Sequence, residues 1–154
     1  MKAEVQKPGS TTPSAKASKS IDWERLTEVL SAVAAVKYAM VFGSARDGVV
    51  RAGSDLDVAV GLTDAEAGNV DCLLDIVGRV EDAFGVTCDP AVLNTAGPVL
   101  RHEALKGRIL FVRPDCENAF SGFYVRTCAE YEDLMVSYAR QLAYRGYGRP
   151  ATGS

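Results

Sequence analysis

Residues 41–60, VFGSARDGVVRAGSDLDVAV, decide how this chain folds and what chemistry it can support. Two carboxylates, Asp55 and Asp57, stand one residue apart in an apolar run that has the composition of a buried strand over residues 55–62. Residues two apart in a strand project from the same face, so these carboxylates project together. Like charges at that spacing repel unless a cation lies between them or one is protonated. Mg²⁺ removes the repulsion and prefers oxygen ligands.

A glycine turn stands upstream of the carboxylates. Gly43-Ser44 is separated from Asp55 by ten residues and follows residues 38–42, which have the pattern of a short buried strand. We expect a brief helix over residues 44–48 and a loop over 49–54. A glycine turn between strand and helix exposes backbone N–H groups, which can bind phosphate. A metal site beside a phosphate site indicates nucleotide chemistry.

This spacing resembles the signature of the minimal nucleotidyltransferases of the DNA polymerase β-like superfamily, with Gly48 in the expected place. The chain departs from that signature at Asp47, because the family usually has a basic residue there; Arg46 stands one place earlier. The resemblance implies a nucleotidyltransferase fold, an α/β (α+β) domain with a small mixed sheet flanked by helices and a long C-terminal helix. It also implies that the nucleotide is bound by Gly43, Ser44, Arg46 and Ser54.

The third candidate carboxylate is Asp89, on a strand expected over residues 86–93. From its small and apolar neighbours alone, Asp89 is as compatible with a charge on an edge strand as with a metal ligand. Pro90 favours an edge, since proline cannot donate a hydrogen bond to the neighbouring strand. The family carries an aspartate on this strand, followed by Leu-Asn, here Leu93-Asn94. The resemblance therefore implies that the metal ligands and catalytic carboxylates are Asp55, Asp57 and Asp89. A lone Asp-x-Asp would more often be a solvated strand end.

The composition is that of one globular domain of 154 residues, 47% apolar and 24% charged. Its net charge of -3 argues against a dedicated nucleic-acid binder, so we expect no direct DNA binding. No apolar run reaches the ~18 residues that cross a bilayer, so no membrane association is expected. Four cysteines without a CxxC pair, and no secretory signal, favour reduced thiols and a cytoplasmic location.

The chain divides into three parts. Residues 1–20 are rich in Ser, Thr, Lys and Ala, and we expect a disordered arm that acts as a solubilising tail or contacts RNA or an acidic partner. Residues 21–146 form the domain, and residues 147–154 are expected to be a flexible tail. Within the domain, Ser20 or Asp22 caps a first helix, Asp64 caps a second that Gly85 ends, and residues 99–106 and 108–112 form a helix and a strand.

A long helix is expected over residues 115–145. Its apolar positions recur every three or four residues, and many of them are aromatic: Phe120, Phe123, Tyr124, Tyr131 and Tyr138. Such a stripe more often belongs to a core, but any exposed part of it would be a protein interface. His102, in the preceding helix, is expected to be exposed rather than a general base, because this chemistry can proceed by positioning and metal electrostatics.

The resemblance implies transfer of AMP from ATP to a hydroxyl, with two Mg²⁺ ions at the carboxylates. Small single-domain proteins of this kind are similar to the antitoxins of HEPN/MNT toxin–antitoxin pairs, which adenylylate a tyrosine of a HEPN ribonuclease toxin. A cognate toxin in a heteromeric complex is thus the expected partner. The alternatives are a small-molecule enzyme like the aminoglycoside nucleotidyltransferases and a non-catalytic toxin-binding module.

Overall fold

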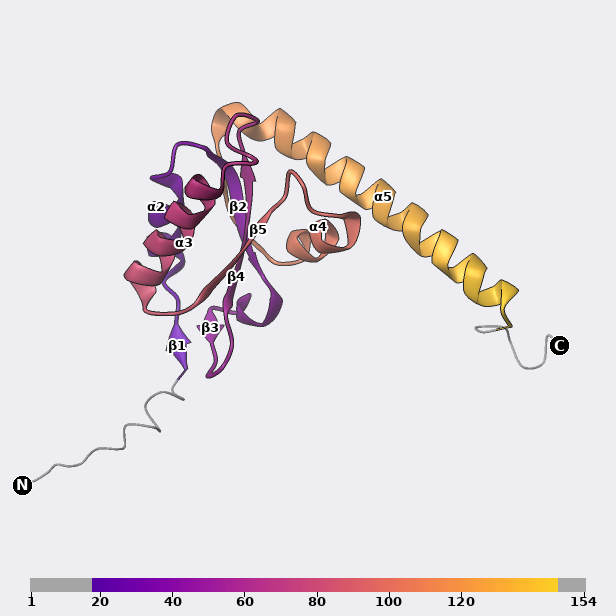
Figure 1. Ribbon diagram of the computed structural model, residues 1–154, viewed down its shortest axis with the longest axis horizontal. Helices are drawn as coiled ribbons and strands as arrows, with labels where there is room; N and C mark the ends of the chain where they lie inside the picture. Colours follow the sequence, from indigo (N-terminus) through magenta and orange to yellow (C-terminus); the bar gives the residue numbers. More distant parts are fainter. Residues whose placement is uncertain (1–17, 147–154) are drawn as a thin grey trace, which may run out of the picture.

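The computed structural model describes residues 18–146, in which a four-stranded sheet has helices on both faces (Figure 1). The strand order is β5-β4-β2-β6, with bounds Cys88–Val92, Leu56–Leu62, Val36–Phe42 and Arg108–Val112. β4 pairs antiparallel with β2 and parallel with β5, so the sheet is mixed. The expected α+β fold with a small mixed sheet and a long C-terminal helix is confirmed.

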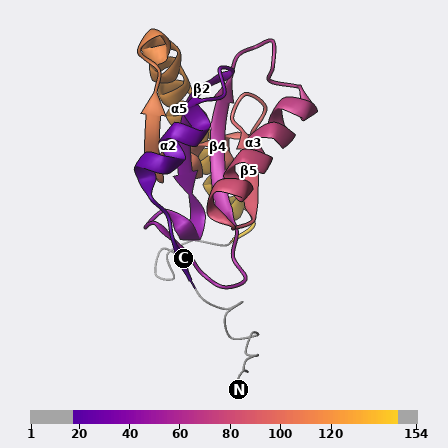
Figure 2. The same ribbon diagram turned by 90° about the vertical axis from the view of Figure 1, so that its left-hand side faces the viewer.

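The two central strands are buried on both faces because different helices cover each face. Helices α2 (Trp23–Ser31) and α3 (Val70–Phe84) lie on one face, where Val41 and Val58 pack with Leu26 and Ile76 (Figure 2). Helix α4 (Pro98–Leu105) and the start of α5 (Glu117–Tyr144) cover the other face. Strands covered on both sides read as continuous apolar runs, which explains the composition of β2 and β4.

Two helix ends follow the sequence signals. Asp22 caps α2, since its side chain accepts hydrogen bonds from the N–H groups of Glu24 and Arg25 at 3.0 and 3.4 Å. Gly85 ends α3 with a left-handed φ of 67°, a conformation that glycine adopts without strain. Pro90 lies on β5, an edge strand as expected. All four cysteines are unpaired, and no helix within residues 18–146 is long and apolar enough to cross a membrane.

The start of α3 differs from the expectation that Asp64 caps it. The N-cap is Asn69, whose side-chain oxygen accepts the N–H groups of Asp71 and Cys72 at 2.9 and 3.4 Å. Residues 64–68 form turns instead of a first helical turn. Gly68, directly before the cap, is a poor helix former, so the helix begins after it.

Other local expectations hold only in part. The brief helix expected over residues 44–48 is a 3₁₀ helix, η1 (Gly43–Ala45), and the expected loop 49–54 begins with the short strand β3 (Val49–Val50). β3 pairs antiparallel with β1 (Lys19–Ser20), so the last two residues of the arm expected to be disordered form a strand. The rest of that expectation, residues 1–17, and the flexible tail over 147–154 lie outside the described residues.

Helix α5 packs on the domain only through its first half, as far as Tyr131. Phe123 and Thr127 are buried, and Phe120 packs beside the Tyr38 ring, whereas the helix then runs away from the sheet (Figure 1). The core interpretation of the stripe is therefore wrong for most of its length. The exposed apolar side chains are Tyr124, Val125, Leu134, Met135, Val136, Tyr138 and Tyr144.

His102 is half-buried rather than exposed, because α4 lies against α5. Its ring stacks on that of Tyr131 with centroids 3.6 Å apart. Next to it in sequence, Arg101 forms an ion pair with Glu130 across the same contact. These pairings assign His102 to the contact between the two helices.

The α3 cap can be tested by mutation. Asn69→Ala should lower the free energy of unfolding by about 1 kcal/mol, because two N–H groups lose their acceptor. Asp64→Ala should change it by less than about 0.5 kcal/mol, since this exposed side chain caps nothing. Urea unfolding of both variants decides the matter, and a larger loss for Asp64→Ala would refute the assignment of the cap.

Candidate active site

Parallel pairing of β4 with β5 brings two of the predicted carboxylates together. Asp57 and Asp89 are direct partners in the β4–β5 register. Asp55 stands just before β4, two residues from Asp57, and so projects toward the same side. Asp55 and Asp89 are exposed and Asp57 is half-buried, so all three are accessible from solvent.

The crowding of these carboxylates changes their electrostatics. Partial burial raises the pKa of Asp57 from 3.8 to about 6, and the charge of Asp89, a hydrogen bond between the two carboxyl groups and the charge of Asp55 add to the rise. Below that pKa, Asp57 keeps a proton that an isolated carboxylate would have lost. The pair is therefore held in an arrangement that a cation would relieve.

The oxygen atoms of the three carboxylates are ligands of the kind that a hard divalent cation prefers. Within residues 18–146, no group of three or more His, Cys, Asp or Glu side chains is already arranged to hold a metal. The geometry is that of a pair, Asp57 with Asp89, and an exposed neighbour, Asp55. All the available ligand atoms are carboxylate oxygens, which suit Mg²⁺. The repulsion between the carboxylates, which adds to the effect of burial on the Asp57 pKa, would be relieved by such an ion.

The glycine turn lies directly beside Asp57. Phe42 at the end of β2 is the register partner of Asp57, and η1 begins at the next residue. Gly43 has a φ of 71° and lies so close to the Asp57 carboxylate that any Cβ would overlap it. Both requirements select glycine here. Gly43 and Ser44 are exposed, so their backbone and hydroxyl are open to a ligand beside the carboxylates.

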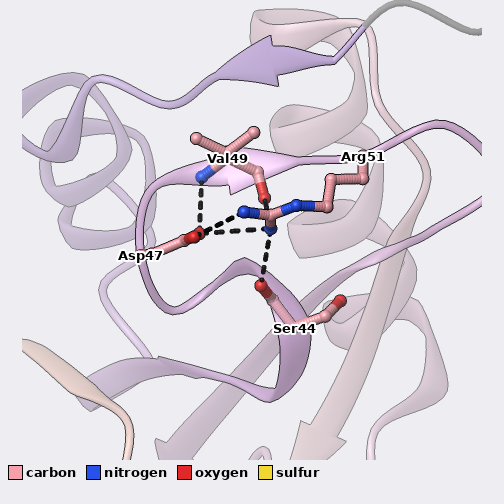
Figure 3. A network of polar contacts seen from close by, with 4 residues as sticks. All are labelled: Ser44, Asp47, Val49 and Arg51. Atoms are coloured by element: carbon pink, nitrogen blue, oxygen red, sulfur yellow. Dashed lines mark hydrogen bonds and ion pairs between the residues drawn. The ribbon is translucent and has the colours of Figure 1, made fainter.

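Asp47, the departure from the family pattern, ties the turn together (Figure 3). Its carboxylate accepts a hydrogen bond from Arg51 Nη2 at 2.7 Å and from the Val49 N–H at 3.1 Å. Arg51 Nη1 also donates to the Ser44 carbonyl at 3.2 Å, which links the far side of the loop back to the glycine turn. These hydrogen bonds lower the pKa of Asp47. The carboxylate at this position thus has a role in fixing the loop.

The two remaining candidates lie on either side of this network. Arg46 is exposed and has no ion pair within the part of the chain that the structure describes. Ser54 closes the turn that leads into Asp55, because its N–H donates to the Arg51 carbonyl at 2.9 Å. The structure therefore places every sequence-predicted site residue at one end of the sheet.

Sequence reasoning missed two side chains at this end. Arg51 stands four residues after Asp47, a spacing that signals an ion pair on a helix, whereas here the pair spans a loop. Arg108 starts β6, is the register partner of Val41, and lies over the Trp23 ring with its guanidinium 4.6 Å from the centroid. No local pattern brings Arg108 to Trp23, since 85 residues separate them.

The sequence of this chain is also similar to that of a known protein family. The sequence matches the family model described as polymerase beta, nucleotidyltransferase, over residues 24–116. The chain belongs to this family. The resemblance to the minimal nucleotidyltransferases is thereby confirmed at the level of the family. No curated protein matches the sequence.

Several solved structures share the fold of this nucleotidyltransferase. A toxin–antitoxin structure with AMP-PNP is 18% identical, with a TM-score of 0.65 over 80% of this chain and 97% of that one. A chain in the structure of a tri-AMPylated HEPN toxin from Shewanella oneidensis with its MNT antitoxin is 16% identical, with a TM-score of 0.59 over 79% of this chain and 97% of that one. A chain in the structure of the toxin–antitoxin MntA–HepT is 17% identical, with a TM-score of 0.58 over 79% of this chain and 93% of that one. At these identities the likeness is one of fold.

The raised pKa of Asp57 predicts an unusual effect of pH on stability. The folded-state value of about 6 exceeds the ordinary 3.8, so the metal-free fold should lose stability as pH rises from about 4 to about 6. Solvent screening reduces the effect to about 1 kcal/mol. Asp57→Asn should therefore raise the thermal midpoint at pH 7 in EDTA by about 2 to 4 °C.

Asp47→Asn is the matched control for this prediction. Because hydrogen bonds lower the pKa of Asp47, its stabilising contribution is present above pH ~4 and is lost on acidification. Its replacement should lower the thermal midpoint at pH 7 and have no effect below the folded-state pKa. A gain for Asp57→Asn that does not vary between pH 4 and pH 7 would contradict the electrostatic account.

Proposed function

We propose that this nucleotidyltransferase transfers AMP from ATP to a tyrosine hydroxyl of a cognate HEPN ribonuclease toxin and so acts as its antitoxin. The observation that carries the proposal is the accessible pair Asp57 and Asp89, held beside the exposed turn at Gly43 in a chain of this family. The similar fold of an MNT antitoxin in complex with a tri-AMPylated HEPN toxin supports the choice of acceptor.

In this proposal the carboxylates hold Mg²⁺, with two ions bound by Asp55, Asp57 and Asp89. Bound Mg²⁺ supplies electrostatic stabilisation of the charge that develops on the phosphate oxygens. The chain binds the triphosphate through the backbone N–H groups after Gly43 and the Ser44 hydroxyl, while exposed Arg46 adds positive charge.

Asp89 is the proposed acceptor of the proton from the attacking hydroxyl, because it is exposed at the edge strand. As that O–H bond breaks, a new bond forms between the hydroxyl oxygen and the α-phosphorus. The bond from the α-phosphorus to the bridging oxygen breaks, and pyrophosphate leaves. Asp57 is half-buried and in close contact with Gly43, and it has no role in this proton transfer.

The acceptor is proposed to be a protein because helix α5 exposes an apolar surface. Val136 is 51% and Tyr138 57% exposed, although both are large and apolar enough to be disfavoured at a free surface. Aromatic and apolar side chains of this kind are enriched in protein interfaces. The exposed half of α5 is therefore the proposed contact surface for the toxin.

The proposal predicts AMP on the toxin. Purified protein is incubated with Mg²⁺ and labelled ATP, with and without the product of the neighbouring reading frame, and intact masses are measured. The partner should gain one or more AMP groups, at a rate that Asp57→Asn lowers about a hundredfold or more. Asp82→Asn, an exposed carboxylate on α3, is the matched control and should leave labelling unchanged.

Each alternative gives a different result in the same experiment. Labelled small hydroxylated compounds, without labelled protein, would replace the proposal with a small-molecule transferase. An Asp57→Asn variant that still neutralises the partner in the absence of any labelling would indicate a binding module. Val136→Asp tests the contact surface, because it should slow labelling of the partner while the fold, measured by circular dichroism, is retained.

A further inference from the structure

A pocket of about 620 Å³ lies at the end of the sheet opposite to the carboxylate pair. Asp57 stands near the start of β4, whereas the pocket begins beyond the end of that strand, at Asp64. The other walls come from the start of β2, the segment after β5 and the first turns of α5. A pocket of this volume accommodates a ligand as large as a nucleotide.

The lining of the pocket is basic, in a chain whose net charge is -3. Its charged members are Lys37, Arg101 and Arg126 against a single carboxylate, Asp64. Arg101 is neutralised by its ion pair with Glu130. Lys37 and Arg126 have no ion pair anywhere in residues 18–146. Two cations from different elements thus face the same pocket with their charges uncompensated.

Tyr38 forms part of the wall of the pocket that both cations line. The Lys37 ammonium is 5.9 Å from the centroid of the Tyr38 ring. Burial raises the pKa of the Tyr38 hydroxyl, and the charge of Arg126 opposes that rise. Lys37 and Arg126 thus line one pocket with Tyr38, although 89 positions separate the two cations in the chain.

Polar groups accompany the cations. Asn118 and Ala119, in the first turn of α5, line the pocket, and the N-cap residue Cys116 makes no side-chain cap hydrogen bond. N–H groups in an uncapped first turn are available to an anion. Thr95 contributes a hydroxyl from the segment after β5. The pocket thus combines cationic and neutral hydrogen-bond donors.

We propose that this pocket is a binding site for a small phosphate-bearing ligand, whose phosphate is held between Lys37 and Arg126. The site is separate from the proposed ATP site, because the length of β4 lies between them. Phosphate rather than a carboxylate fits a pocket lined by two cations and further donors, since its several oxygens can accept from all of them. The inference does not rest on the proposed transferase activity.

Titrations followed by amide NMR test this site, with inorganic phosphate and then AMP as probes in EDTA. Saturable shifts should occur at residues 118–122 and at Thr95. Arg126→Gln and Lys37→Met should each weaken binding about tenfold or more, because each removes a charged hydrogen-bond donor. Arg126→Lys should retain most of the affinity. Arg140→Gln, on the same helix but outside the pocket, is the matched control and should bind like the wild type.

The two probes identify the source of the phosphate. Tighter binding of AMP than of inorganic phosphate, with the same dependence on Lys37 and Arg126, would identify a nucleotide ligand, and equal affinities would identify phosphate alone. The proposal is overturned by shifts that fail to saturate, that persist undiminished in Arg126→Gln and Lys37→Met, or that occur only around Gly43.

Discussion

The pairing of two carboxylates across adjacent parallel strands is the constraint on which the rest of the structure depends. Asp57 and Asp89 are register partners, and partial burial together with the nearby Asp89 carboxylate raises the pKa of Asp57 to about 6. Parallel partners require a crossover connection, which helix α3 provides between β4 and β5. The close approach of the Asp57 carboxylate in turn requires glycine at position 43. The register of β4 and β5, the crossover through α3 and the turn at Gly43 together determine how the carboxylates are arranged.

The same fold separates three surfaces in space. The carboxylates and the glycine turn lie at one end of β4, and the basic pocket lies beyond its other end. Helix α5 starts beside that pocket and extends away from the sheet with an exposed apolar face (Figure 1). Because the first turns of α5 are fixed by Phe123 in the core, the exposed half has a defined direction relative to the sheet.

Local signals in the sequence predicted the elements that depend on neighbouring residues. The projection of Asp55 and Asp57 toward one side, the cap at Asp22 and the end of α3 at Gly85 each follow from spacing or from the conformational preference of one residue. The α3 cap was missed because Asp64 and Asn69 are both good N-caps, and Gly68 lies between them. The candidate site residues came from these local patterns and from the family resemblance, whereas their common position at one end of the sheet is visible only in the structure.

Features that depend on distant parts of the chain were not predictable in this way. The β1–β3 pair involves only two residues in each strand, too few to leave a periodic signal. His102 contacts Tyr131 because two helices pack together, and a solitary histidine gives no indication of that contact. The ion pair between Asp47 and Arg51 could be recognised only once the conformation of the loop was known. The exposure of α5 was equally hidden, since core stripes and interface stripes have the same period.

The most direct test of the account is the number of protons released when Mg²⁺ alone binds to the protein. Isothermal titration in buffers of different ionisation enthalpy measures this number. A pKa of about 6 for Asp57 predicts release of roughly half a proton at pH 6, little release at pH 8, and loss of both binding and release in Asp57→Asn. Mg²⁺ binding without proton release at pH 6, or release that persists in Asp57→Asn, would contradict the assignment of the carboxylate pair as the metal site.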